Sequence, residues 1–223
     1  MSQDIKAIVT RAQQGEADAL EQLVRLIQDR VHRLAIRMLV DPELAQDATQ
    51  EILIRVVTKL STFKGDSKFE TWVYRVATNY LLTAKKILAR DPGLSFEMFA
   101  ADLVDGLVDD TVAAPEDHVM LNELRVRCTM AMLLCLDPAH RAAYVLGDIL
   151  ELDHREASDV LEIASATYRQ RLSRARSKVQ AFTAQSCGLA SAQAACSCPR
   201  RLPAAMAAGR VGADPQVMSR GAE

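Results

Sequence analysis

The sequence lacks the long apolar runs, cysteine pairs and histidine clusters that mark membrane, disulfide-bonded and many catalytic proteins. Its longest unbroken apolar run, residues 130–136, is far too short to cross a bilayer. Its five cysteines are an odd number gathered late in the chain, which disfavours a disulfide framework. Its four histidines are scattered, and neither a nucleophile–base pair nor a phosphate-binding loop is evident. We therefore expect that the protein is not an enzyme.

The composition is otherwise that of a soluble globular protein. Hydrophobic residues make up 49% and charged residues 25% of the 223 residues, a length that suits two small domains. The net charge of −2 argues neither for nor against a nucleic-acid partner. Residues 1–16 lack the apolar core of a signal peptide, so we expect a cytoplasmic protein.

Apolar spacing predicts an all-α fold with two small helical domains, because no segment sustains the alternation of a strand. Asp41 before Pro42 is typical of a helix start. A further helix is expected to begin with a capping box of Ser67 and Glu70 and to run to the end of the first domain, residues 1–88.

A flexible acidic linker is predicted at residues 89–117. Together with one residue on either side, this segment holds eight Asp or Glu against one Arg, with prolines, glycines and no helical period. Such a charge run is typical of a solvated tether.

A second helical domain, with a helix-turn-helix outline, is predicted at residues 118–182. Asp153 and Glu156 form a capping box before a short helix, and a tight turn at residues 162–165 leads into a second helix. The second helix carries five basic residues and no acid: Arg169, Arg171, Arg174, Arg176 and Lys178. Positive charge concentrated on one helix suits phosphate contact and entry into a DNA groove.

Residues 63–80 hold five of the ten aromatic residues in the chain, with three cations among them. Two interpretations stay open: a dense piece of core, or a surface that holds a flat, negatively charged ligand. Trp72 and Tyr80 are the rings expected in the core. The loop 63–68 combines flexible backbone, cations and flanking rings, which suits an unstacked base of single-stranded nucleic acid.

Two stretches, residues 47–81 and 136–179, resemble regions 2 and 4 of the sigma-70 family, specifically its extracytoplasmic-function (ECF) group. They read DATQEILIRVVTKLSTFKGDSKFETWVYRVATNYL and LDPAHRAAYVLGDILELDHREASDVLEIASATYRQRLSRARSKV. The resemblance runs from about residue 16 to residue 182 in the family's order. It implies a sigma factor that binds core RNA polymerase and directs promoter recognition and strand opening.

The resemblance also implies roles for individual residues. The surface expected to bind the β′ clamp helices of polymerase comprises Asp47, Gln50, Glu51 and Ile54. The residues expected at the −10 element, where an unpaired base is captured, are Phe63, Lys64, Asp66, Ser67, Lys68, Trp72, Arg75, Asn79 and Lys86. Those expected at the −35 element in duplex DNA are Glu156, Ser165, Thr167, Arg169, Gln170, Arg171, Arg174 and Arg176.

The implied partners are core polymerase, with its β and β′ subunits, and promoter DNA in duplex and single-stranded form. The acidic linker would run toward the RNA exit path of polymerase, and an anti-sigma factor is left open as a further partner.

Three positions depart from the family pattern in the helix-turn-helix. Glu162 stands where the family usually has a glycine, and Ala164 stands where it usually has a serine cap, so Ser165 is expected to cap one residue later. Tyr168 replaces a usual aliphatic residue. These changes leave the −35 sequence unpredicted.

The resemblance ends near Phe182, and we expect the tail, residues 183–223, to be largely disordered. Its cysteines are Cys187, Cys196 and Cys198. Three interpretations stay open for them: incidental thiols, a zinc site, or a disulfide or sulfenic-acid switch. A zinc site would bind about one ion per chain and would need a fourth ligand such as His154, a water or another chain's residue. No other cofactor is expected.

Two alternatives to a sigma factor come from other classes of regulator. One is a stand-alone helix-turn-helix protein that binds duplex DNA, which needs neither the aromatic loop nor the polar stripe around Asp47. The other is a metal- or redox-responsive regulator that uses the cysteine tail, and it can coexist with sigma activity.

Cys128 and Cys135 share an apolar helix face and are predicted to be small core residues.

Overall fold

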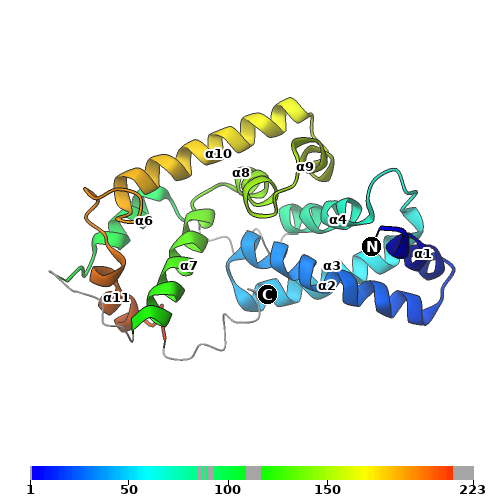
Figure 1. The fold of residues 1–223 in the computed structure, drawn as a ribbon, viewed down its shortest axis with the longest axis horizontal. Coiled ribbons are helices and arrows are strands. Elements are labelled where there is room, and N and C mark those ends of the chain that lie inside the picture. The colour runs from blue at the N-terminus through cyan, green and yellow to red at the C-terminus, as the bar shows by residue number, and fades with distance from the viewer. Residues whose placement is uncertain (1, 85–86, 88, 90–92, 109–116, 213–223) are drawn as a thin grey trace. The chain divides into compact units, whose positions relative to one another are not determined.

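The computed structural model describes residues 2–84, 87, 89, 93–108 and 117–212. Within these ranges every regular element is a helix and no strand occurs, which confirms the all-α prediction (Figure 1). The chain divides into two compact units. Unit 1 comprises Met1–Asp91 and Pro138–Ser173, and unit 2 comprises Pro92–Asp137 and Arg174–Glu223. No helix in the described part of the chain is long and apolar enough to cross a membrane.

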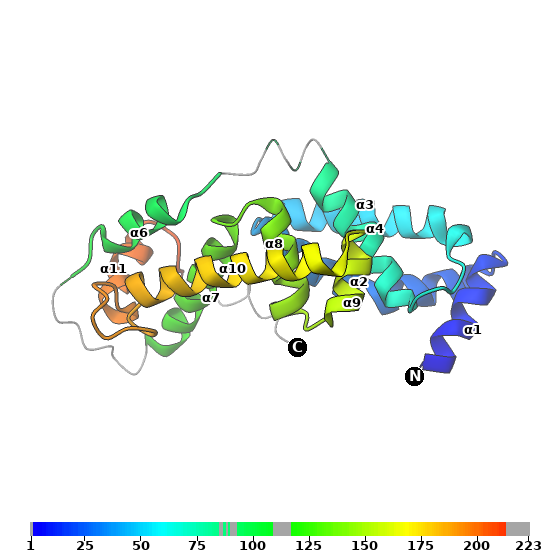
Figure 2. The same cartoon turned by 90° about the horizontal axis from the view of Figure 1, so that it is seen from above.

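Unit 1 holds most of the helices. Its elements are α1 (Ser2–Gln13), α2 (Ala17–Leu39), α3 (Pro42–Lys59), the 3-10 helix η1 (Leu60–Thr62), α4 (Phe69–Thr83), α8 (Pro138–Tyr144), the π-helix η3 (Val145–Ile149), α9 (His154–Leu161) and the start of α10 (Ser165–Ser186). Figure 2 shows α10 as one continuous helix, which continues into unit 2.

Helix α2 packs against α1, α3 and α4 through apolar stripes at helical spacing. The stripe of α2 includes Leu23, Val31 and Leu34, and that of α3 includes Ile52 and Val56, all of them at most 2% exposed. Complete burial of one such side chain contributes about 1.5–3 kcal/mol. The mutual burial of these stripes therefore determines which faces of α2 and α3 remain at the surface.

The predicted helix starts have different outcomes. Asp41 begins α3 as predicted, because its carboxylate accepts the Leu44 N–H at 2.9 Å. Asp153 caps α9 by accepting two backbone N–H groups, at 2.8 and 2.9 Å. The capping box at Ser67 is wrong: α4 begins after Lys68, and the Ser67 hydroxyl donates to the Lys68 carbonyl instead. The helix also ends at Thr83, because the next residue is extended, with a ψ of 118°.

A buried arginine joins the two parts of the sequence that make up unit 1. Arg141 of α8 is 4% exposed, and its guanidinium donates to the Met38 carbonyl oxygen at 2.8 Å. Met38 lies in the last turn of α2, which ends where Val40 takes a left-handed conformation with a φ of 56°. The last carbonyl groups of a helix have no partner within it, so Arg141 satisfies one of them. Unit 1 thus combines residues from both predicted domains.

Unit 2 contains α6 (Phe96–Val104), α7 (His118–Leu134), the rest of α10, and α11 (Cys198–Ala207). Two of these helices lie where the sequence predicted a flexible linker and a largely disordered tail, so both predictions are wrong for these residues. Helix α6 forms because Ser95 caps it, accepting the Met98 N–H at 3.1 Å, and because Phe99 and Leu103 are both buried. Helix α11 likewise buries an apolar side, at Leu202.

Ile52 and Ile54 lie in the same helix in opposite environments, the first 0% and the second 58% exposed. Replacing Ile52 by alanine should lower the free energy of unfolding by about 2–5 kcal/mol, because it leaves a cavity in the core of unit 1. Ile54→Ala is the matched control and should change that free energy by less than about 0.5 kcal/mol. Denaturant unfolding followed by circular dichroism measures both, and equal losses would contradict the described orientation of α3.

Candidate nucleic-acid interface

One face of α3 is exposed along most of the helix. The residues predicted to bind polymerase all lie on it: Asp47, Gln50, Glu51 and Ile54. The opposite face, which includes Ala48 and Ile52, is buried in unit 1. The exposed face thus carries two carboxylates, an amide and a large apolar side chain.

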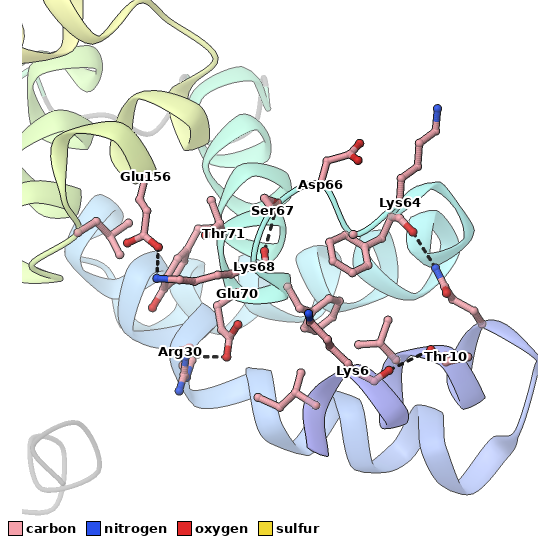
Figure 3. Close-up of a pocket in the computed structure, with 18 of the residues that line it drawn as sticks. Lys6, Thr10, Arg30, Lys64, Asp66, Ser67, Lys68, Glu70, Thr71 and Glu156 are labelled. Carbon is pink, nitrogen blue, oxygen red and sulfur yellow. Dashed lines mark hydrogen bonds and ion pairs between the residues drawn. The ribbon is translucent and has the colours of Figure 1, made fainter. Parts of the chain in front are cut away.

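The loop 63–68 joins η1 to α4 and borders an open pocket of about 980 Å³ (Figure 3). Gln13 of α1 holds the start of this loop. Its amide donates to the carbonyl oxygens of Leu60 and Phe63, both at 2.9 Å. Other residues of α1, among them Lys6, line the pocket as well. The loop is therefore positioned by a helix that lies far from it in the sequence.

Three aromatic rings pack together at the base of this loop. The Phe63 ring centroid lies 5.4 Å from that of Phe69 and 5.6 Å from that of Trp72, and the rings of Phe69 and Trp72 are stacked at 5.8 Å. Phe69 and Trp72 are buried, and so is Tyr80, over whose ring the Arg55 guanidinium lies at 4.8 Å. The aromatic-rich stretch is thus mainly core, whereas Phe63 keeps part of its ring exposed.

The polar residues predicted at the −10 element fall into several environments. Exposed on the loop and on α4 are Lys64, Asp66, Lys68 and Asn79, and Ser67 is half-buried. Arg75 is half-buried, and its Nε donates to the Asp159 carbonyl oxygen at 3.0 Å. Trp72 lies beneath the surface, where it supports the loop. Lys86 lies outside the described residues.

An ion pair within unit 1 joins a residue predicted at the −10 element to one predicted at the −35 element. The Lys68 ammonium donates to the Glu156 carboxylate (Figure 3). This hydrogen bond raises the pKa of Lys68 above its ordinary value, and the charge of Glu156 adds to the effect. The Lys68 side chain is 72% exposed and that of Glu156 is 22% exposed, so solvent screens the lysine end of the pair. Phosphate groups can therefore compete for the lysine at little cost.

Helices α9 and α10 form the predicted helix-turn-helix. Between them Glu162 takes a left-handed conformation, with a φ of 53°, which glycine adopts more easily. The cap predicted at Ser165 is wrong, since α10 already begins at Ser165 and the Tyr168 N–H donates to the Ala164 carbonyl oxygen at 3.0 Å. The Ser165 hydroxyl lies instead 2.9 Å from that of Ser158 in α9.

Tyr168 anchors the start of α10 in unit 1. Its side chain is 0% exposed, and its hydroxyl donates to the Ala143 carbonyl oxygen at 3.4 Å. Gly147 leaves room for it, because a Cβ at that position would lie 2.4 Å from the tyrosine oxygen. The predicted −35 residues lie around the rest of the helix surface: Ser165, Arg169, Gln170, Arg174 and Arg176 are exposed, and Thr167 and Arg171 are half-buried.

Comparison with known proteins identifies the family. The family description "Sigma-70 region 2" matches residues 23–90, and "Sigma-70, region 4" matches residues 127–179. The ECF RNA polymerase sigma factor SigW of Bacillus subtilis is 30% identical over 186 residues, which cover 79% of this chain and 95% of SigW. The chain belongs to the sigma-70 family. It is a transcription-initiation sigma factor of the ECF group, as the sequence predicted, and the stand-alone regulator is not favoured.

A second ECF sigma factor is similar in sequence, and two solved structures are similar in fold. The ECF RNA polymerase sigma-E factor of Escherichia coli is 29% identical over 179 residues, which cover 78% of this chain and 91% of that protein. Among solved structures, CnrH in complex with the cytosolic domain of CnrY has a TM-score of 0.56 at 22% identity, covering 79% of this chain and 94% of CnrH. RpoE of Bartonella quintana, in complex with the anti-sigma factor NepR, has a TM-score of 0.50 at 21% identity. Both structures share the fold.

Sequence reasoning missed the contribution of α1 to this ECF sigma factor. The helical spacing of Ile8, Val9 and Ala12, all of them buried, was an available signal for that helix. The role of Gln13 had no such signal, because its amide bonds backbone carbonyls 47 and 50 residues away. Any polar side chain on the exposed edge of an amphipathic helix presents the same pattern.

The predicted zinc site is not supported. Among the described residues, no group of three His, Cys, Asp or Glu side chains is placed to hold a metal ion, and all five cysteines are free thiols. Cys187 and Cys196 pair through an isolated backbone bridge, in which the Gly188 N–H donates to the Cys196 carbonyl oxygen at 2.8 Å. Cys128 and Cys135 pack against the apolar clusters of unit 2, as expected of small core residues.

Two of these thiols should be slow to react. Burial raises the pKa of Cys128 to about 12 and that of Cys196 to about 11, which keeps both thiols neutral at pH 8. Because the thiolate is the reactive form, Cys196 should be alkylated by iodoacetamide roughly 100-fold more slowly in the native chain than in denaturant, and Cys128 more slowly still. Peptide mass spectrometry at pH 8 measures the rates. The native rate at Cys196 should rise as the pH approaches 11, and equal rates in native and denatured protein would contradict the burial of these thiols.

Proposed function

We propose that this sigma factor binds core RNA polymerase through the exposed face of α3, captures an unpaired promoter base at the loop 63–68, and contacts duplex DNA through α9 and α10. The observation that carries the proposal is the open pocket beside the loop, where exposed cations surround a half-buried ring. A sigma factor must both hold polymerase and stabilise separated strands. The residues available for these tasks lie on separate surfaces of the chain.

The loop 63–68 has the components that an unpaired base requires. Lys64 and Lys68 can contact the phosphates on either side of the base, and the pocket beside them admits a flat ring. Phe63 offers the exposed part of its ring for stacking, while Phe69 and Trp72 hold it in place from below. Extrusion of a base costs a few kcal/mol, so these contacts would offset part of the cost of strand opening.

The second DNA contact is duplex DNA at α10. The arginines of this helix can neutralise phosphates and reach base edges in the major groove. Glu156 of α9 can accept a hydrogen bond from a base once it separates from Lys68. Because the lysine end of the Lys68–Glu156 pair is exposed, promoter DNA would compete with the pair at Lys68.

An anti-sigma factor is a further partner that we propose. RpoE of Bartonella quintana shares the fold of this chain and is bound to the anti-sigma factor NepR in its structure. CnrH, which also shares the fold, is bound to the cytosolic domain of CnrY.

Substitutions on the exposed face of α3 should weaken the binding of this protein to core RNA polymerase. Glu51→Lys and Ile54→Ala should each weaken binding to core RNA polymerase by about 10-fold, since each removes a contact from the proposed surface. Asp29→Lys, on an exposed part of α2, is the matched control for the charge change and should leave the affinity unchanged. Fluorescence anisotropy with labelled sigma factor measures the affinity. A loss that is equal in the control would point to net charge rather than to a specific surface.

The two DNA contacts should respond differently to a promoter that is already open. Asn79→Ala should reduce run-off transcription from duplex promoters about 10-fold, because it removes an exposed amide of α4 that the family resemblance assigns to the −10 element, and a premelted promoter should restore activity. Arg171→Ala should weaken closed-complex binding and reduce its salt dependence by about one charge, with no rescue by premelting. If premelting rescues both variants or neither, the division of labour between the two surfaces is wrong.

A further inference from the structure

The linker helix α6 is packed within unit 2 by the end of α10 and by the residues that follow it. The Phe182 ring of α10 stacks on Phe99 at 5.2 Å between centroids, with 16° between the planes, and lies 5.1 Å from Phe96. Phe99 and Leu103, only 6% and 5% exposed, share an apolar cluster with Phe182 and Cys196. The apolar side of the linker is therefore covered by α7, by α10 and, from the residues after α10, by Cys196.

The acidic side of the same helix is bound by two arginines from the tail. Arg201 is 5% exposed, and its guanidinium reaches the Asp102 carboxylate at 3.1 Å and the Asp105 carbonyl oxygen at 2.5 Å. Arg210 donates to the same Asp102 oxygen at 2.5 Å. Burial of an arginine is costly unless its charge is paired, so the Asp102 contact is part of what holds Arg201 inside unit 2.

The end of the linker is bound through its backbone. The Val108 N–H donates to the Arg200 carbonyl oxygen at 3.3 Å, and the Arg200 Nε donates to the Val108 carbonyl oxygen at 2.9 Å. Gly106 has a φ of 67°, and a Cβ there would lie 3.2 Å from the Cβ of Ala204, so α11 approaches the linker closely at this turn. Residues 96–108 are thus contacted by aromatic rings, paired charges and backbone hydrogen bonds in succession.

The chain turns back at a defined place to make these contacts. After α10 ends at Ser186, the bridge between Cys187 and Cys196 closes the turn that leads into α11. Gly188 is required there, because a Cβ at that position would lie 2.5 Å from the Cys196 carbonyl oxygen. The backbone bridge between Cys187 and Cys196 and the buried Arg201 indicate that the residues after α10 form a folded binding site rather than a loose extension.

We propose that residues 187–212 form a binding site for the sigma factor's own acidic linker and that this site competes with polymerase for the linker. The second part rests on the proposed function, in which the linker runs toward the RNA exit path. A linker whose apolar residues are buried and whose Asp102 is paired with two arginines is not available to polymerase. The tail therefore restrains initiation until the linker is released.

Hydrogen exchange of the full-length chain tests the site without polymerase. Asp102→Asn removes the charge that pairs with both arginines, and amides of residues 99–108 should exchange about 10-fold faster. Glu97→Gln is the matched control, since Glu97 is an exposed acid of the same helix, and it should leave these rates unchanged. Arg210→Ala, which changes a side chain that is 51% exposed, is the second variant if Asp102→Asn does not fold. Amides of α3 in unit 1 serve as the internal reference.

Run-off transcription with core polymerase tests the competition. Asp102→Asn, and a chain that ends at residue 186, should each increase transcription several-fold at limiting sigma concentration, whereas Glu97→Gln should not. Unchanged hydrogen exchange at α6 in both Asp102→Asn and Arg210→Ala would overturn the binding site. Faster exchange with unchanged transcription would overturn the competition. If the unaltered chain does not support transcription at all, the proposed function fails, while the exchange result still decides whether the tail binds the linker.

Discussion

Burial of the apolar stripes of α2, α3 and α4 is the constraint on which the rest of unit 1 depends. Once side chains such as Leu34 and Ile52 are removed from water, the rotation of each helix about its axis is determined. That rotation also determines which residues of α3 form its polar face and which residues of α4 are exposed. The same packing brings Gln13 of α1 to the loop 63–68, so the core that stabilises the unit also shapes its candidate base pocket.

Aromatic side chains are scarce in this protein, and the fold concentrates them where a loop must be held still. The rings of Phe63, Phe69 and Trp72 form one cluster at the base of the pocket, and those of Phe96, Phe99 and Phe182 form another in unit 2. The first cluster supports the loop 63–68, and the second supports the short helix α6. Rings bury much apolar area with few rotatable bonds, which suits this purpose.

The charged contacts divide by burial into two kinds. The Lys68 end of the Lys68–Glu156 pair is exposed to solvent, which screens the pair and leaves the lysine available to DNA. Arg141 and Arg201 are instead buried, and each donates to a backbone carbonyl oxygen at the end of another helix. Removal of a buried arginine leaves such acceptors unsatisfied, so these residues hold segments together over about 100 residues of sequence, as Arg141 does with Met38, 103 positions away.

Side-chain spacing within single segments was enough to predict the helical class, the exposed stripe of α3, the burial of Trp72 and Tyr80 and the helix-turn-helix. The family, too, followed from motifs that are contiguous in sequence. Long-range packing, in contrast, makes the residues near Asp102 form a helix, brings Arg201 to it, and brings Gln13 to the loop 63–68. Composition predicted a flexible linker because its acids outnumber its bases, but partners distant in sequence neutralise Asp102 and cover Phe99. A local pattern cannot report such partners, since the free energy that orders these segments comes from contacts made only in the folded chain.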